Sequence, residues 1–245
     1  MDSGYYSISS ALNARTQELD TIANNLANAS TVGYRAQENV FGSVLASAGN
    51  DAESALNQAV NTYGVLSGTT LDQSQGALQK TGNALDTAIE GPGYFVVQTA
   101  NGQVYTRNGS FQVSGRGQLV TSAGDAVMGD KGPIAMPPGQ VSISADGTIS
   151  SDGAVVGKLD IVEMNPNTQL TGMGGSYYSA PSGSVHPATA SNVRQGMLES
   201  SNVNPILSMV QLVTAQRTAE MMQRALSIFN SEINKTATQD LPKVG

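Results

Sequence analysis

The sequence predicts an α+β fold in which terminal N- and C-helices flank a central, mostly antiparallel β domain. Apolar residues recur every three or four positions at both ends of the chain, whereas the middle alternates with a period of two. Since residues three and four apart share one face of a helix, each end should bury a single stripe. We expect these two helices to pair as a coiled-coil-like layer.

The N-terminal helix is expected to begin near Ser3 or Ser7, either of which can cap its first amide groups. Its end is indicated by poor helix formers and by Gly33, which can adopt a left-handed conformation. We assign residues 1–35 to this part of an inner core domain. Its stripe consists of Tyr5, Ile8, Leu12, Leu19, Ile22, Leu26 and Ala29, interrupted only by Arg15.

Residues 36–75 are predicted to be a linker, with some helix early and an extended tail, because Ala, Ser, Asn, Gly and Gln dominate. The central β domain is assigned to residues 76–192. Its strands are expected up to about residue 165, and loop from there to 192. Short β-branched and aromatic runs alternate with hairpin signals at Asn101-Gly102, Asn108-Gly109, Asp146-Gly147 and Asp152-Gly153.

The C-terminal helix is assigned to residues 193–245, with Asn204-Pro205 as the capping side chain and first-turn proline. After this proline, apolar and small residues are spaced by three or four positions without a break from Leu212 to Ile233. This second stripe consists of Leu212, Ala215, Ala219, Met222, Leu226, Phe229 and Ile233.

Composition excludes several classes of function. Charged residues make up 13% of the chain, against about a quarter in ordinary domains, and the net charge is −7. Twelve scattered basic residues form no stripe for nucleic acid, and acidity disfavours an anionic membrane surface. No apolar run is long enough to span a membrane. The opening Met-Asp-Ser-Gly-Tyr-Tyr lacks the bases of a secretory signal, so we expect a cytosolic protein or export without cleavage.

No catalytic, cofactor-binding or metal-binding residues are predicted. The chain has no cysteine, which excludes thiolate chemistry, and His186 is expected in an exposed loop rather than at a metal. The glycine clusters lack phosphate-binding spacing. We therefore expect neither a small-molecule substrate nor a cofactor.

Four segments resemble the bacterial flagellar basal-body rod and hook proteins, in the same order along the chain. They are Ile22-Ala23-Asn24-Asn25-Leu26-Ala27-Asn28-Ala29-Ser30-Thr31-Val32-Gly33-Tyr34-Arg35, residues 82–91, residues 93–111, and Gln195-Gly196-Met197-Leu198-Glu199-Ser200-Ser201-Asn202-Val203-Asn204. Within the family, the short segment 43–70 and the opening residues are most similar to the proximal-rod member, with the distal-rod member second.

The resemblance implies a structural subunit that leaves the cell unfolded through the flagellar type III export apparatus, without a cleaved signal, and assembles beneath a rod cap. Its terminal helices would form the inner layer of a hollow helical tube that transmits torque across the periplasm. Partners would be further copies of itself and the neighbouring rod proteins. The resemblance makes Asn24, Asn25 and Asn28 hydrogen-bonding residues between helices.

The residues that we expect in the assembly interface therefore lie on both terminal helices. They are Ile8, Leu12, Leu19, Ile22, Asn24, Asn25, Leu26, Asn28, Leu212, Ala215, Ala219, Met222, Leu226, Phe229 and Ile233. Two alternatives stay open from the residues alone. One is another self-assembling or adhesive surface protein with terminal coiled coils, and the other is an enzyme on a β scaffold, for which the sequence offers no cluster of titratable groups.

Overall fold

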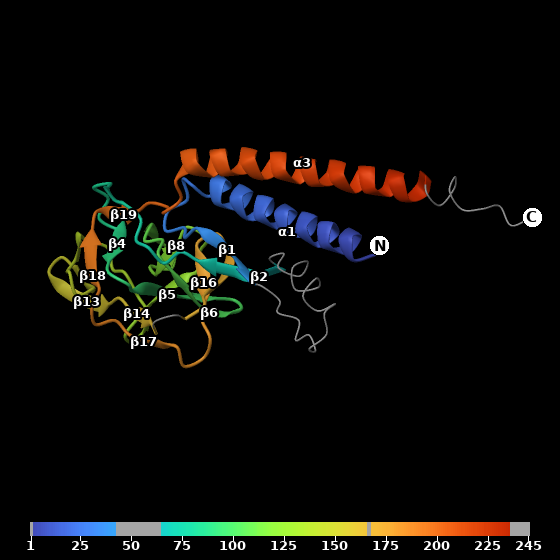
Figure 1. Ribbon diagram of the computed structural model, residues 1–245. Helices are drawn as coiled ribbons and strands as arrows, with labels where there is room; N and C mark the ends of the chain where they lie inside the picture. Colours follow the sequence, from blue (N-terminus) through green and yellow to red (C-terminus); the bar gives the residue numbers. More distant parts are fainter. Residues whose placement is uncertain (1, 43–64, 166–167, 236–245) are drawn as a thin grey trace, which may run out of the picture. The chain divides into compact units, whose positions relative to one another are not determined.

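The computed structural model describes residues 2–42, 65–165 and 168–235 (Figure 1). The chain divides into two compact units. The helical unit comprises Met1–Leu26, Gln37–Thr69 and Pro205–Gly245, and the β unit comprises Ala27–Ala36 and Thr70–Asn204. Each unit is thus built from segments that are far apart in the sequence. Both long helices belong to one unit and most strands belong to the other, which agrees with the predicted α+β class.

Two long helices belong to the helical unit: α1 (Asp2–Ala27) and α3 (Pro205–Lys235). Helix α1 ends where the sequence predicts. A turn follows it, in which the Thr31 amide donates to the Asn28 carbonyl at 3.0 Å, and Gly33 has a φ of 69°. Helix α3 begins at the predicted proline. Within the described ranges, neither helix is long and apolar enough to cross a membrane.

The segment after α1 forms a strand where we expected some helix. Strand β1 (Gln37–Gly42) pairs with β2 (Val65–Leu71) in a two-stranded sheet. The prediction of early helix in the linker is therefore wrong at Gln37–Gly42. The pairing explains the error, because a strand partner some twenty residues further along outweighs a weak local helix preference. Residues 43–64 of the predicted linker lie outside the described residues.

The β unit is built around a ten-stranded sheet whose main order is β15-β16-β6-β5-β9-β8-β7, with β10, β14 and β17 attached at its side. These strands are β5 (Tyr94–Thr99), β6 (Gly102–Thr106), β7 (Phe111–Val113), β8 (Leu119–Thr121), β9 (Ala126–Gly129), β10 (Gly132–Pro133), β14 (Ile161–Met164), β15 (Thr171–Gly174), β16 (Tyr177–Ser179) and β17 (Val185–Pro187). The pairings in this sheet are antiparallel, as predicted.

Smaller sheets complete the β unit. One has the order β11-β12-β13, and the pairs β18-β4 and β19-β3 form the others. Their strands are β3 (Leu78–Lys80), β4 (Thr87–Glu90), β11 (Val141–Ile143), β12 (Thr148–Ser151), β13 (Ala154–Lys158), β18 (Asn192–Gln195) and β19 (Met197–Glu199). Strands β18 and β19 therefore extend the β unit beyond residue 192, up to the start of α3.

Residues 165–192 correct a second expectation. We predicted loop here, yet β15, β16 and β17 lie in this stretch. Their partners are remote: β16 pairs with β6, and β17 pairs with β14. Strands of three or four residues carry little local signal, so their conformation depends on these tertiary pairings.

Two apolar clusters form the core of the β unit. The larger includes Phe95 and Phe111, whose rings meet edge to face with centroids 5.1 Å apart, and Ile149. The smaller is built around Tyr94, Val96 and Tyr178. Strand β5 contributes to both clusters because successive side chains point to opposite faces of the sheet.

Phe95 lies fully inside the larger cluster, and its replacement provides a test of this core. Phe95→Ala should lower the free energy of unfolding by about 3–5 kcal/mol, since it leaves a cavity that the packed strands cannot close. Urea unfolding of the full chain measures this loss. Val155→Ala, on the exposed face of β13, is the matched control and should change stability by no more than about 0.5 kcal/mol. Equal losses in the two variants would contradict the core assignment.

Candidate functional site

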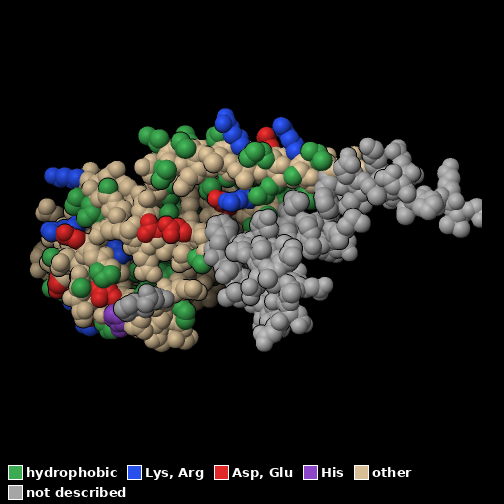
Figure 2. Space-filling model, in the orientation of Figure 1, with side chains coloured by type: hydrophobic (Ala, Val, Ile, Leu, Met, Phe, Trp, Pro, Cys, Tyr) green, Lys and Arg blue, Asp and Glu red, His purple; other side chains and the backbone are tan. Residues whose placement is uncertain are grey.

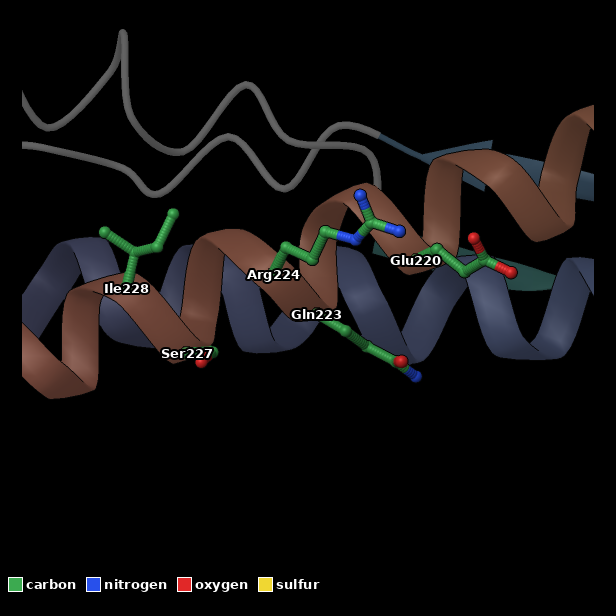
Figure 3. Close-up of a pocket in the computed structure, with 5 residues that line it drawn as sticks. All are labelled: Glu220, Gln223, Arg224, Ser227 and Ile228. Carbon is green, nitrogen blue, oxygen red and sulfur yellow. The ribbon is translucent and has the colours of Figure 1, made fainter.

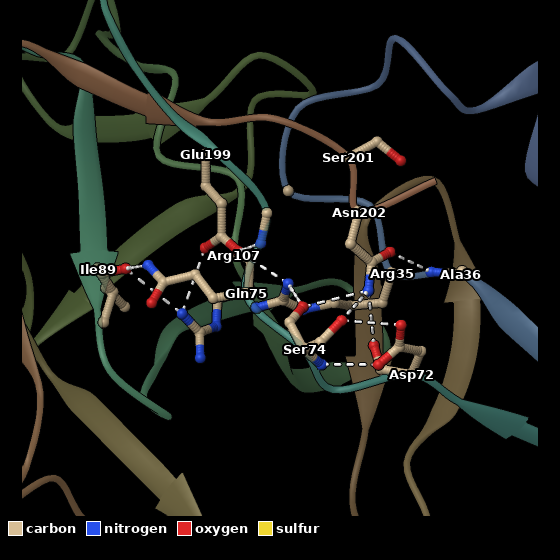
Figure 4. Close-up of polar contacts among 12 residues, drawn as sticks. Arg35, Ala36, Asp72, Ser74, Gln75, Ile89, Arg107, Glu199, Ser201 and Asn202 are labelled. Atoms are coloured by element: carbon tan, nitrogen blue, oxygen red, sulfur yellow. Dashed lines mark hydrogen bonds and ion pairs between the residues drawn. The ribbon is translucent and has the colours of Figure 1, made fainter. Parts of the chain in front are cut away.

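The most unusual feature of the β unit is a buried group of three charged side chains (Figure 4). Glu199 lies between two guanidinium groups: its Oε1 is 2.8 Å from Arg35 Nη1, and its Oε2 is 3.2 Å from Arg107 Nη1. All three side chains are at most 2% exposed. Because a charge loses much of its solvation inside a protein, such a group persists only when the partners neutralise and hydrogen-bond one another.

Backbone groups and an aromatic ring supply further contacts to these charges. Arg107 Nη2 donates to the Gly91 carbonyl at 2.7 Å, and its guanidinium carbon lies 4.7 Å from the centre of the Tyr94 ring. The Gly76 amide donates to Glu199 Oε1 at 2.9 Å. Burial lowers the pKa of Arg107, and the Glu199 carboxylate acts in the opposite direction. Arginine nevertheless stays protonated in proteins, so Arg107 remains charged.

Asn202 joins the same region from the chain leading into α3. Its Oδ1 accepts the Ala36 amide at 2.7 Å, while its Nδ2 donates to the Asp72 carbonyl at 3.0 Å and the Ser74 carbonyl at 3.1 Å. Arg35 Nη1 also donates to the Ser74 carbonyl. We call Arg35, Ser74, Arg107, Glu199 and Asn202 the junction cluster. It ties the segment after α1, the segment after β2 and the segment before α3 to one another.

Gly33 shows how closely these segments approach. Its amide donates to the Glu199 carbonyl at 2.8 Å, and a Cβ atom there would lie 2.4 Å from the backbone nitrogen of Asn108. The Tyr178 hydroxyl accepts the Arg35 amide at 2.8 Å and lies 3.2 Å from the Gly33 carbonyl, to which it can donate. Burial raises the pKa of this hydroxyl well above its usual range. Tyr178 therefore stays neutral at physiological pH.

A second buried carboxylate, Glu163 on β14, holds the chain before β18. Its Oε1 accepts the Ala190 amide at 2.9 Å, the Thr189 amide at 3.2 Å and the Ser191 hydroxyl at 2.8 Å. Burial acts to raise the pKa of Glu163, but these hydrogen bonds outweigh it and the pKa is lowered. His186 on β17, which lies opposite Glu163 in the strand pairing, also lowers the pKa of Glu163.

Neither group of buried charges resembles a reaction centre. The described residues contain no cluster of three or more His, Asp or Glu side chains that could hold a metal ion. His186 was expected in an exposed loop, but it lies on β17 with intermediate exposure, and its Nδ1 is 3.3 Å from the Pro187 carbonyl. The carboxylates of the junction cluster and of β14 are fully engaged by structural hydrogen bonds.

The predicted apolar interface residues whose side chains the structure describes occupy the less exposed faces of their helices. On α3, Ala215 and Ala219 are buried, and Leu212, Met222 and Leu226 are half-buried. On α1, the half-buried residues are Leu12, Leu19, Ile22 and Leu26. The side chains of Ile8, Phe229 and Ile233 lie outside the described residues. A role of these positions between subunits stays a prediction.

The predicted asparagines have local contacts. Asn25 Nδ2 donates to the Gln37 carbonyl and its Oδ1 accepts the Gln37 amide, both at 2.8 Å. Asn28 Oδ1 accepts the Thr31 hydroxyl at 3.1 Å. Asn24 is exposed. Asn25 therefore fixes the turn from α1 into β1, and hydrogen bonds of the three asparagines between helices stay a prediction.

Comparisons with known proteins identify three matching family profiles. "Flagella basal body rod protein" matches residues 6–35, "Flagellar hook protein FlgE/F/G D1 domain" matches residues 88–155, and "Flagellar basal body rod FlgEFG protein C-terminal" matches residues 194–239. FlgF of Caulobacter vibrioides is 32% identical over the whole of both chains. FlgF of Escherichia coli is 35% identical over 93% of this chain and 94% of the length of that FlgF.

The chain belongs to the flagellar basal-body rod protein family. FlgG of Buchnera aphidicola subsp. Schizaphis graminum is 30% identical over 91% of this chain and 94% of its own, so the chain is more like these FlgF proteins. The junction cluster takes one charged residue from each matched region: Arg35, Arg107 and Glu199. It is thus the place where the three signatures of a rod protein meet.

Sequence reasoning missed this cluster, although all three charged residues lie inside the motifs that carry the resemblance. A signal was present: in a chain with 13% charged residues, an Arg at the end of the N-terminal signature and a Glu inside the C-terminal one stand out. The sequence contains nothing, however, that indicates that they are buried together.

Glu199→Gln tests the buried charges. It leaves two buried guanidinium groups without a carboxylate, and we expect the free energy of unfolding of the β unit to fall by about 3–5 kcal/mol. Glu90→Gln is the matched control, because Glu90 and Arg194 form an ion pair of 2.7 Å with both side chains about half exposed. That variant should lose at most about 1 kcal/mol. Equal losses in denaturant unfolding would show that burial adds nothing to the Glu199 pair.

The lowered pKa of Glu163 predicts a pH dependence of stability. The folded protein stabilises the ionised form of Glu163 more than the unfolded chain does. The contribution of Glu163 to the free energy of unfolding is therefore complete above the ordinary pKa of about 4.3, and it declines as the pH falls through the folded-state pKa. Glu163→Gln should flatten this part of the curve of unfolding free energy against pH. A variant that follows the wild-type slope throughout the acidic range would contradict the assignment.

Proposed function

We propose that this chain is a structural subunit of the bacterial flagellar basal-body rod, of the FlgF type, and not an enzyme. The observation that carries the proposal is the match over the full length to FlgF proteins, including both terminal signatures. The junction cluster supports a mechanical role, because within the β unit it joins residues of both signatures through buried charges and backbone hydrogen bonds.

The finer assignments are part of the same proposal. Residues 1–35 and 193–245 supply the inner helical layer, in which α1 and α3 pair as a coiled-coil-like layer, and residues 76–192 supply the surrounding β domain. Copies of the chain and neighbouring rod proteins together form a hollow helical tube that transmits torque across the periplasm. The type III export apparatus and the rod cap are the further partners, and export leaves the N-terminus uncleaved. Buried small residues on α3 support helix packing at this stripe.

Ala219 on α3 provides a test of the terminal helices. Ala219→Glu places a charge on the buried stripe of α3 and should abolish swimming in a flagellated strain that depends on this chain. Ala225→Glu makes the same exchange at an exposed position of the same helix and should preserve swimming. Swimming in soft agar and the presence of the chain in isolated basal bodies are measured. Normal swimming of the Ala219→Glu strain would contradict the role of the stripe.

A further inference from the structure

The surface of the chain carries few charged groups. Figure 2 shows acidic and basic side chains scattered among uncharged ones on the face that it draws. A shallow hollow on α3 is lined by Glu220, Gln223, Arg224, Ser227 and Ile228 (Figure 3). Glu220 lies about two turns of helix before Ser227, too far to act as a base for its hydroxyl. The reactive groups that this surface does offer are side-chain amides.

Asparagine followed by glycine is the amide most prone to react without a catalyst. The glycine nitrogen attacks the side-chain carbonyl carbon of asparagine and closes a succinimide ring. The bond from that carbon to the side-chain nitrogen breaks, and the nitrogen leaves as ammonia with the proton that the glycine nitrogen has lost. Water then opens the ring to aspartate or isoaspartate. Glycine favours the attack because it has no Cβ to obstruct its nitrogen, but the asparagine side chain and the next peptide must be able to rotate.

The sequence contains two such pairs, Asn101-Gly102 and Asn108-Gly109. Asn101 lies in the turn between β5 and β6, directly before the Thr99–Gly102 strand pair. It is exposed, and a Cβ atom at Gly102 would meet no atom within 4 Å. Among the described residues, the Asn101 backbone amide donates to Thr99 Oγ1 at 3.2 Å, and its side chain makes no hydrogen bond. The side chain can therefore turn toward the Gly102 nitrogen.

Asn108 and Gly109 are held on every side. Asn108 Oδ1 accepts the Ser110 amide at 3.0 Å, and the Asn108 backbone amide donates to Thr106 Oγ1 at 3.0 Å. Gly109 is buried, and its carbonyl accepts the Thr87 amide at 3.0 Å. A Cβ atom at Gly109 would lie only 1.6 Å from the Thr87 carbonyl oxygen. Ring closure at Asn108 would first require these contacts to open.

Two Asp-Gly pairs can form the same ring, but their carboxylates are also engaged. In Asp146-Gly147, the aspartate accepts the Thr148 hydroxyl at 2.8 Å and the Thr148 amide at 3.2 Å. In Asp152-Gly153, Oδ1 of the aspartate accepts the Gln140 amide at 2.9 Å. An ionised carboxylate is moreover a poorer electrophile than an amide. Of these four pairs, the one at Asn101 best meets the requirements of the reaction.

We propose that Asn101 is a site of spontaneous modification, at which the folded chain deamidates through a succinimide with Gly102, and that Asn108 is protected from the same reaction. The product carries one more negative charge. Isoaspartate also lengthens the backbone of the turn by one carbon, and turn length sets the register of a hairpin. The Thr99–Gly102 pair is therefore the first to be lost in a modified chain. This chemistry is independent of the proposed rod function.

Both sites can be measured in one sample of the purified full chain. After incubation at neutral and at mildly alkaline pH, mass spectrometry compares tryptic peptides 81–107 and 108–116, which carry Asn101 and Asn108 separately. Fragment ions distinguish Asn101 from Asn83 within the first peptide. Since an exposed turn opens far more readily than a buried segment, we expect Asn101 to deamidate faster than Asn108 by about tenfold or more. Both isoaspartate and aspartate should form, faster at the higher pH.

The chain unfolded in guanidinium chloride is the control for local sequence, because both Asn-Gly pairs are then unrestrained. There the two rates should agree within about twofold, since no folded structure protects either site. In Asn101→Gln the reaction at residue 101 should disappear, because glutamine would have to close a larger ring, and circular dichroism should be unchanged. Equal rates at the two sites in the folded chain, no reaction at either, or a tenfold difference that persists in guanidinium chloride would overturn the inference.

Discussion

The ion pairs that Glu199 makes with Arg35 and Arg107 constrain the rest of the β unit. A carboxylate with essentially no exposure is tolerable only while both guanidinium groups stay within hydrogen-bonding distance. Each of the three residues comes from a different part of the chain, so the ion pairs hold the segment after α1 and the segment before α3 against the residue that follows β6. Hydrophobic burial alone would fix the relative position of these segments less strictly, because it is not directional.

Glycines allow the backbones to come close enough for this arrangement. A Cβ atom at Gly76 would lie 1.9 Å from the Ser200 carbonyl oxygen, and one at Gly109 would lie 1.6 Å from the Thr87 carbonyl oxygen. Gly33 combines a similar contact with a positive φ. The amides of Gly33 and Gly76 then donate directly to Glu199, and the Asn202 side-chain amide donates to the carbonyls of Asp72 and Ser74. The charged centre and the close backbone contacts thus depend on each other.

The sequence predicts those features that local chemistry decides. The end of α1 near Gly33, the start of α3 at Pro205 and the antiparallel strands with their hairpin turns all follow from capping, turn and periodicity rules. Strands β1, β15, β16 and β17 were missed because they are short, and because the partners of β1, β16 and β17 are separated from them in the sequence. The junction cluster was missed for the same reason: Arg35, Arg107 and Glu199 are separated by long stretches of chain, and no local pattern reports that they meet.

Helix α3 shows a further limit of periodicity. The spacing of three and four predicts a stripe through Ala215 and Ala219, and these two residues are buried. Periodicity does not say how a second set of apolar residues on the opposite side is used, because both sets satisfy the same rule. Side-chain size separates them. Small residues let another part of the same chain approach closely, whereas Ile206, Val210 and Ile228 are large and exposed, and gain most of their hydrophobic free energy only when a neighbour covers them.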